Sequence, residues 1–168
     1  LPDQNIDPEK IEAAITNKTK AIVPVHLSGR ICDMDTIMEI AKKHGLKVVE
    51  DAAQAVGSKY KNRASGSMGD LGCFSTHPLK NLNACGDGGF LVTNEENLYS
   101  KAKLLRNHGM ADRDRVETFG YVSRMDNLQA AILNFRLNKL DQIIQKRRKN
   151  AKYYFEHIDS ERLSLPVE

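Results

Sequence analysis

Three side chains with useful chemistry follow the ends of apolar segments in this sequence. Asp51 comes directly after the run "LKVVE", Ser75 follows the short run "CF", and Lys80 lies five residues beyond Ser75. In open α/β sheets, ligands bind outside the carboxyl ends of the strands. We therefore expect the carboxylate, the hydroxyl and the amine to converge on one crevice.

These three groups match the chemical needs of pyridoxal phosphate. A carboxylate can neutralise a cationic ring nitrogen, a hydroxyl can bind a phosphate, and an amine shielded from water can form an imine with an aldehyde. Each group also has an ordinary structural explanation. Asp51 could cap the turn at "EDAAQA", Ser75 could bond to nearby backbone, and Lys80 could be a surface lysine. Residue type and spacing alone therefore indicate an α/β ligand-binding domain and leave its ligand open.

The elements that would position these groups alternate between helix and strand. "DPEKIEAAI" begins with Asp7 as an N-cap and Pro8 at the first helical position. The run 20–27 ("KAIVPVHL") has the length and apolar character of a strand covered on both faces, although Pro24 cannot donate to a strand ladder. A helix from Asp33 to the stop at Gly45, followed at once by "LKVVED", completes a βαβ unit with a parallel sheet.

The second half of the sequence changes character. "GCFST" and "GGFLVT" are typical of two more short strands, and "NEENLYSKAKLLRNHG" predicts a helix capped by Asn94 and closed by Gly109. Residues 124–158 form one long helical pattern with a break near Asp141, of the kind that crosses between domains or packs on a partner subunit. The glycines of "GDGG" lack the spacing of a dinucleotide loop and indicate a turn that needs positive φ.

Composition excludes several classes of protein. The 168 residues are 40% hydrophobic and 28% charged, as in a globular domain, and the net charge of +3 is spread along the chain, which does not favour nucleic acid. The cluster "KRRK" at 146–149 is expected to be a solvated helix face. Three scattered cysteines and five scattered histidines predict no disulfide framework and no metal site. Without a bilayer-length apolar run, we expect a soluble protein of the cytoplasm.

Five segments, in order and spacing, resemble the DegT/DnrJ/EryC1/StrS family of pyridoxal-phosphate-dependent aminotransferases of fold type I. They are "VPVHLSG", "DMDTIMEIAKKHGLKVVEDAAQAVGSKY", "GSMGDLGCFSTHPLKNLNACGDGGFLVTN", "LLRNHG" and "GYVSRMDNLQAAIL". The resemblance covers nearly the whole chain. Its most specific part is the pairing of "EDAAQA" with the spacing S-x4-K-N-L.

The resemblance implies a role for four residues. Lys80 matches the lysine that forms the Schiff base with the cofactor and moves a proton between the cofactor carbon and the sugar carbon. Asp51 matches the acid that pairs with the pyridinium nitrogen, Gln54 the contact to the phenolic oxygen, and Ser75 a phosphate ligand. The implied reaction takes an amino group from an amino acid, usually glutamate, and delivers it to a nucleotide-linked keto sugar, in the biosynthesis of cell-surface polysaccharide or natural-product sugars.

Some residues depart from the family pattern. Val122 stands in "GYVSR" where relatives often carry an Asn that reaches the cofactor phosphate of the neighbouring subunit, so that contact is lost or comes from Ser123. Asn83 and Cys85 stand where relatives often have Gly and an aromatic or small residue, and we assign them no catalytic role. Lys80 itself argues against the branch of the family in which His replaces the lysine and the reaction is a deoxygenation.

The resemblance also implies a domain organisation. We expect an α/β fold with a three-layer, mainly parallel sheet, the large domain of a fold type I aminotransferase truncated at both ends. Residues 1–124 would be part of the cofactor-binding large domain, 125–158 a long helix region that leads to the small domain, and 159–168 the start of the truncated C-terminal small domain. Family members are typically homodimers with shared active sites. Alone, these 168 residues are expected to bind the cofactor poorly and to show little transamination.

Three alternatives remain at this stage. The first is a non-catalytic regulatory or sensory protein that keeps the fold to bind a sugar or cofactor, which Val122 favours and the intact Lys80 opposes. The second is an aminotransferase that acts on a cyclic non-sugar ketone, which only a panel of substrates would separate from the sugar enzyme. The third, a simple nucleotide-binding domain, is weak because the phosphate-loop glycine pattern is absent.

Overall fold

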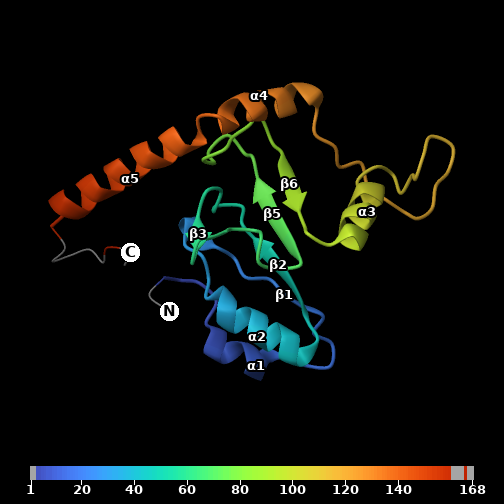
Figure 1. Ribbon diagram of the computed structural model, residues 1–168, viewed down its shortest axis with the longest axis horizontal. Helices are drawn as coiled ribbons and strands as arrows, with labels where there is room; N and C mark the ends of the chain where they lie inside the picture. Colours follow the sequence, from blue (N-terminus) through green and yellow to red (C-terminus); the bar gives the residue numbers. More distant parts are fainter. Residues whose placement is uncertain (1–2, 160–164, 166–168) are drawn as a thin grey trace.

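A four-stranded sheet with the order β1-β2-β5-β6 lies at the centre of the chain (Figure 1). The structure is a computed structural model that describes residues 3–159 and residue 165. Its strands are β1 (Ala21–Ile22), β2 (Lys47–Asp51), β3 (Lys59–Tyr60), β4 (Arg63–Ala64), β5 (Leu71–Ser75) and β6 (Gly89–Val92). Its helices are α1 (Pro8–Ala14), the short 3-10 helix η1 (Leu27–Gly29), α2 (Met34–His44), α3 (Glu96–Leu105), α4 (Asn127–Leu137) and α5 (Leu140–His157).

The predicted βαβ unit is confirmed. β1 pairs with β2 in parallel, with Ile22 opposite Val48, and α2 connects the two strands. The Asp33 side chain accepts from the N–H of Thr36 at the start of α2, and Gly45 ends the helix in the left-handed conformation with φ 63°. That conformation suits glycine because it has no Cβ. β5 adds to β2 in parallel and β6 pairs with β5 antiparallel, so the predicted α/β class with a mainly parallel sheet is confirmed.

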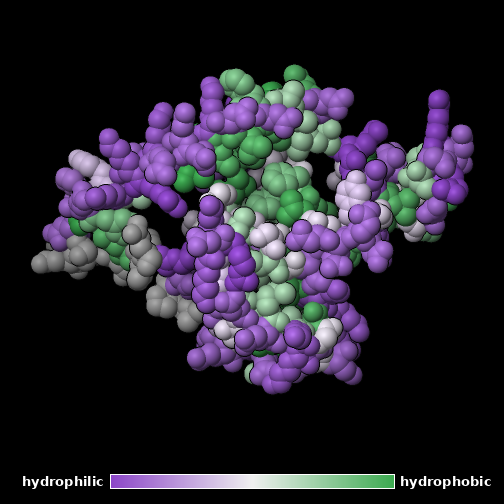
Figure 2. Space-filling model, viewed as in Figure 1, coloured by the Kyte–Doolittle hydropathy of each residue, from purple (hydrophilic) through white to green (hydrophobic). Residues whose placement is uncertain are grey.

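Two apolar clusters hold the sheet between helices. Helices α1 and α2 lie side by side and cover the first cluster, whose fully buried members are contributed mainly by α2 and the strands beside it (Figure 1). The second cluster lies between α4 and the strands β5 and β6, where Phe74 and Phe90 stack with ring centroids 4.8 Å apart. Figure 2 shows this second group of apolar side chains as the green area beneath α4. The residues that follow β5 are therefore held from the side of α4.

The predicted strand at 20–27 is wrong in extent. Regular pairing stops after Ile22, and beyond it only a bridge between Val25 and Asp51 continues the alignment. Pro24 is buried and has no N–H to donate, so a regular ladder cannot pass through it. Val23 is 53% exposed, so among the described residues this segment is covered on one face and not on both.

Smaller differences concern the ends of helices. Glu95, not Asn94, occupies the N-cap position of α3, and Thr93 Oγ1 accepts the N–H of Glu95 instead. Gly109 does help to close α3, because its N–H bonds to the carbonyl of Leu104 with φ 70°. The helical pattern of 124–158 divides into α4 and α5 at residues 138–139, slightly before the predicted break. Most of the predicted segment 159–168 lies outside the described residues.

Candidate active site

A hollow of about 290 Å³ opens at the carboxyl ends of β2 and β5. Asp51 and Ser75 both line it, as the topology of a parallel sheet requires. Its remaining walls are mostly apolar or small. They are Val23, Val49, Ala53, Cys73, Phe74 and Gly88. The structure thus brings together two of the predicted site residues in a small, open and largely apolar hollow.

The alternation of β2 explains why Asp51 faces this hollow. Successive strand residues point to opposite faces of the sheet. Val48 and Glu50 are fully buried on one face, whereas Val49 and Asp51 line the hollow on the other. The adjacent strand β5 is in register, with Cys73 opposite Asp51. A polar residue at the end of a buried strand is therefore directed to the ligand side by its position alone.

The hydrogen bonds already made by Asp51 and Ser75 leave the groups that a ligand would need. One carboxylate oxygen of Asp51 accepts the N–H of Ala53 at 3.0 Å, and the other takes no hydrogen bond within the described part of the chain. Ser75 Oγ accepts the N–H of His77 at 3.2 Å, so the hydroxyl proton remains available to donate. A carboxylate oxygen can thus accept from a protonated ring nitrogen, and a hydroxyl can donate to a phosphate.

A buried hydroxyl lies behind the wall of the smaller hollow next to Ser75. Gly88 lines the hollow, and a Cβ at this position would lie 2.7 Å from Thr76 Oγ1. The Thr76 hydroxyl is fully buried and has no hydrogen-bond partner among the residues that the structure describes. Buried hydroxyls are normally paired, so the unpaired hydroxyl of Thr76, behind the Gly88 wall of the hollow, leaves a donor available next to the site. These residues fit pyridoxal phosphate.

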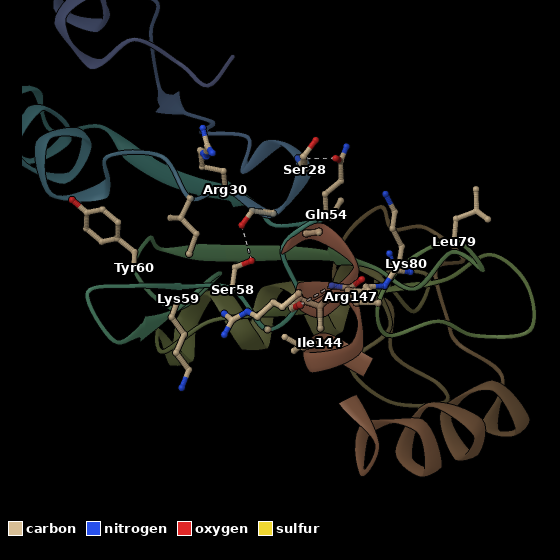
Figure 3. A pocket seen from close by; sticks show the side chains of 18 residues that line it. Ser28, Arg30, Gln54, Ser58, Lys59, Tyr60, Leu79, Lys80, Ile144 and Arg147 are labelled. Atoms are coloured by element: carbon tan, nitrogen blue, oxygen red, sulfur yellow. Dashed lines mark hydrogen bonds between the residues drawn. The ribbon is translucent and has the colours of Figure 1, made fainter. Parts of the chain in front are cut away.

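Lys80 and Gln54 line a second, larger hollow of about 840 Å³ (Figure 3). Gln54 accepts the N–H of Ser28 at 2.9 Å through its carbonyl oxygen, which leaves its NH₂ group free to donate. Ala53 lines both hollows, so they adjoin. The predicted single crevice is therefore two neighbouring hollows, with Asp51 and Ser75 in the smaller one and Gln54 and Lys80 in the larger one.

The larger hollow is basic. Five of its lining residues carry a positive charge and none of its described lining residues is Asp or Glu. The five are Arg30, Lys59, Lys80, Arg147 and Arg148. Clefts lined by charge of one sign raise the local concentration of ligands with the opposite charge. This hollow therefore favours an anionic ligand, and phosphate is one of the anions that arginine binds through paired hydrogen bonds.

On the other face of the sheet, the hydrogen bonds of one buried carboxylate hold β2 in place. The carboxylate of Glu50 accepts from His26 Nε2 at 2.9 Å and from three backbone N–H groups at 2.6 to 2.7 Å. Burial alone raises the pKa of Glu50, but the hydrogen bonds outweigh burial and hold the pKa below its ordinary value. Glu50 is therefore an anion that fixes the strand immediately before Asp51.

Sequence reasoning missed some residues of the site. Val49 and Cys73 could have been found from the period-two alternation of their strands, since each lies two residues before a predicted site residue. Burial, and then the nearby charge of Asp51, raise the pKa of the Cys73 thiol, so it stays protonated beside the hollow. Arg147 and Arg148 are exposed, as expected for a solvated helix face, yet they also line the larger hollow.

The sheet and its site define a class, that of the fold type I pyridoxal-phosphate aminotransferases. Within that class, the chain belongs to the DegT/DnrJ/EryC1/StrS aminotransferase family, whose profile matches residues 2–167. It is similar to a transaminase of Aneurinibacillus thermoaerophilus named for dTDP-3-amino-3,6-dideoxy-α-D-galactopyranose, at 50% identity over 97% of this chain and 45% of the relative. It is also similar to a "pleiotropic regulatory protein" of Geobacillus stearothermophilus, at 49% identity over 89% of this chain and 40% of that protein.

Solved structures agree with this assignment. The DesV protein of S. venezuelae, solved with a ketimine intermediate, superposes with a TM-score of 0.92 at 42% identity, over 99% of this chain and 46% of that one. The NtdA protein of Bacillus subtilis, solved with bound PMP, gives a TM-score of 0.84 at 40% identity, over 93% and 36% of the two chains. The chain thus spans less than half the length of these relatives. Within the described residues, no helix is long and apolar enough to cross a membrane.

Proposed function

We propose that the chain forms part of a pyridoxal-phosphate-dependent aminotransferase. It would take an amino group from an amino acid, glutamate, in the first half-reaction and deliver it to a nucleotide-linked keto sugar in the second. The observation that carries this proposal is the pairing of two adjoining hollows. One presents a carboxylate and a hydroxyl, and the other presents the amine of Lys80 among further cations.

When bound, pyridoxal phosphate supplies an electron sink that stabilises negative charge on the carbon next to the transferred nitrogen. Asp51 would hold the proton of the ring nitrogen, and Ser75 would donate to the phosphate. The free NH₂ group of Gln54 would donate to the phenolic oxygen. Lys80 Nζ would hold the cofactor covalently until the amine of the incoming substrate displaces it, and the freed amine would then accept and return the proton that moves between the cofactor carbon and the sugar carbon.

The basic lining of the larger hollow supports a substrate that carries phosphate. A nucleotide-linked sugar has a diphosphate between its base and its sugar, and Arg147 and Arg148 are placed to neutralise such a charge. Relatives named for dTDP-, GDP- and UDP-linked sugars have chemistry of this kind. We expect the active protein to be a homodimer in the cytoplasm.

The decisive experiment tests the role of Lys80 in the protein produced from its complete reading frame. Borohydride reduction in the presence of pyridoxal phosphate should attach the cofactor to the peptide that contains Lys80, and Lys80→Ala should abolish both this adduct and transamination from glutamate to a keto sugar nucleotide. Lys59→Ala is the matched control, because Lys59 lines the same hollow. Attachment at Lys59, or full transamination by Lys80→Ala, would overturn the proposal.

A regulatory protein that binds the cofactor without turnover is the second candidate. The similarity to a protein named as a pleiotropic regulator favours it, as does Val122, which is 67% exposed and offers no side-chain hydrogen bond. The same experiment separates the two candidates. A protein that forms the Lys80 adduct but aminates no member of a panel of keto sugar nucleotides and cyclic ketones would be the regulator.

A further inference from the structure

The segment that carries Lys80 is tied to helix α4 by one arginine. We define this segment, Pro78–Gly86, as the Lys80 loop. Arg136 Nη1 donates to the carbonyl of Asn83 at 2.6 Å and to the carbonyl of Ala84 at 3.3 Å, and it also donates to the side-chain oxygen of Asn83. A single guanidinium therefore holds both backbone and side-chain oxygens of the loop.

A second residue of α4 holds the same loop. Gln129 Oε1 accepts the N–H of Cys85 at 2.8 Å. Gln129, Leu133 and Arg136 lie at spacings of four and three residues, which places them on one face of the helix. Leu133 is buried against Leu82 in the second apolar cluster. The face of α4 toward the loop thus has an apolar contact at its centre and a polar contact on either side.

Asn83 transmits this attachment toward Lys80. Its Nδ2 donates to the carbonyl of Pro78 at 2.7 Å, while its oxygen accepts from Arg136. The N–H of Lys80 donates to the carbonyl of His77 at 2.9 Å and closes a turn over residues 77–80. Pro78, whose carbonyl accepts from Asn83, belongs to this turn. The contacts therefore run from α4 through Asn83 to the turn that bears Lys80.

We propose that Arg136 is a positioning residue that fixes the Lys80 loop on α4, with Asn83 as its partner. The assignment of a reaction to Lys80 rests on the proposed function, whereas the attachment of the loop does not. Arginine suits this role because its rigid, planar guanidinium holds Nη1 where the three oxygens converge, whereas a lysine would bring its single nitrogen on a flexible stem. The packing of Leu133 does not depend on Arg136, so the helix should stay docked when the guanidinium is removed.

The test compares Arg136→Met, Arg136→Lys and Asn83→Ala with the control Lys139→Met, which also removes a positive charge at the end of α4. Hydrogen exchange, measured without cofactor, should become at least about tenfold faster at the Cys85 amide in Arg136→Met, since losing about 1.4 kcal/mol of protection corresponds to a factor of ten. Arg136→Lys should exchange at an intermediate rate. The control should leave the Lys80 loop unchanged.

The second readout is the rate of borohydride capture of pyridoxal phosphate at Lys80. This rate should fall about 10- to 100-fold in Arg136→Met, because small displacements of a reacting group have effects of this size. The double variant Asn83→Ala, Arg136→Met should be no slower than the slower single variant, because both residues belong to one chain of contacts. Unchanged exchange in Arg136→Met, or an equal effect of Lys139→Met, would overturn the proposal. If the unsubstituted protein captures no cofactor, the proposed function fails, and hydrogen exchange alone still decides the role of Arg136.

Discussion

Replacing Glu50 by Gln tests how β2 is fixed, because the two side chains have the same shape and differ in charge. Oε1 of Glu50 accepts the N–H groups of Met68 and Gly69, both at 2.6 Å. Oε2 accepts His26 Nε2 at 2.9 Å and the N–H of Gly66 at 2.7 Å. Four donors thus converge on two oxygens, and a glutamine offers one oxygen and one NH₂ group.

Neither orientation of a glutamine amide satisfies these donors. In one orientation the NH₂ group faces the two backbone donors on the Oε1 side. In the other it faces His26, whose ring could accept at Nε2 only if the proton moved to Nδ1. Nδ1 already accepts the N–H of Cys32 at 3.4 Å, so two donors would then face each other. Every arrangement therefore leaves at least one buried donor without an acceptor.

The expected cost follows from the number of bonds lost. A hydrogen bond to a charged group contributes about 1.5 to 3 kcal/mol, and breaking a buried ionic arrangement costs about 3 to 5 kcal/mol. We therefore expect Glu50→Gln to lower the free energy of unfolding at pH 7 by about 3 kcal/mol or more, against a typical total of about 5 to 15 kcal/mol.

The dependence on pH separates this explanation from a simple packing defect. Because the pKa of Glu50 is lowered in the folded protein, the anion stabilises the fold above the ordinary carboxyl pKa and loses this effect as the pH falls through the lowered value. Urea unfolding from pH 7 down to pH 3 should show the unsubstituted protein approaching Glu50→Gln in acid. Glu12→Gln, at an exposed carboxylate, is the control and should change little. A difference that stays constant with pH, or no difference at pH 7, would refute the reasoning.

Other substitutions and labels test the site and the sheet. Asp51→Asn should bind pyridoxal phosphate about 10- to 100-fold more weakly in an absorbance titration, since a charge-assisted hydrogen bond is worth about 1.5 to 3 kcal/mol, and unchanged affinity would count against its role. A maleimide should label the exposed Cys85 in the folded protein and Cys32 only after unfolding, because burial excludes the reagent and raises the pKa of the Cys32 thiol to about 11. Gly72→Ala should lower the free energy of unfolding by about 1 to 3 kcal/mol in urea, because its Cβ would overlap the backbone of Gly66, and an unchanged midpoint would contradict this packing.

The parts of the fold that sequence could predict are those set by neighbouring residues. Asp7 and Asp33 cap their helices through their own side chains, and Gly45 supplies the positive φ that ends α2. These interactions span three or four residues, so their signals lie close together in the chain. The carboxyl-end position of Asp51 and Ser75 could also be predicted, because it needs only the order of strands in a parallel sheet.

The parts that could not be predicted depend on contacts between distant residues. The larger hollow is closed on one side by α5, and Arg147 lies 67 positions after Lys80 in the sequence. The hairpin of β3 and β4 turns through Lys61 and Asn62, both with positive φ, and a lysine gives little sign of that conformation. The Asn83 side chain accepts from Arg136 on α4, so no pattern of neighbouring residues could predict that Asn83 holds the loop.

The pair Glu50 and Asp51 shows how one strand end can serve both stability and chemistry. Successive strand residues point to opposite faces of the sheet. Glu50 therefore points into the interior, where four hydrogen-bond donors bind its carboxylate, and Asp51 points to the ligand side. Rigid anchoring of the first residue limits the directions open to the second. The same logic applies to Lys80, whose loop is held by Arg136 from a different helix. The carboxylate and the amine are thus fixed by separate elements, and the relation between them depends on how α4 docks against β5 and β6.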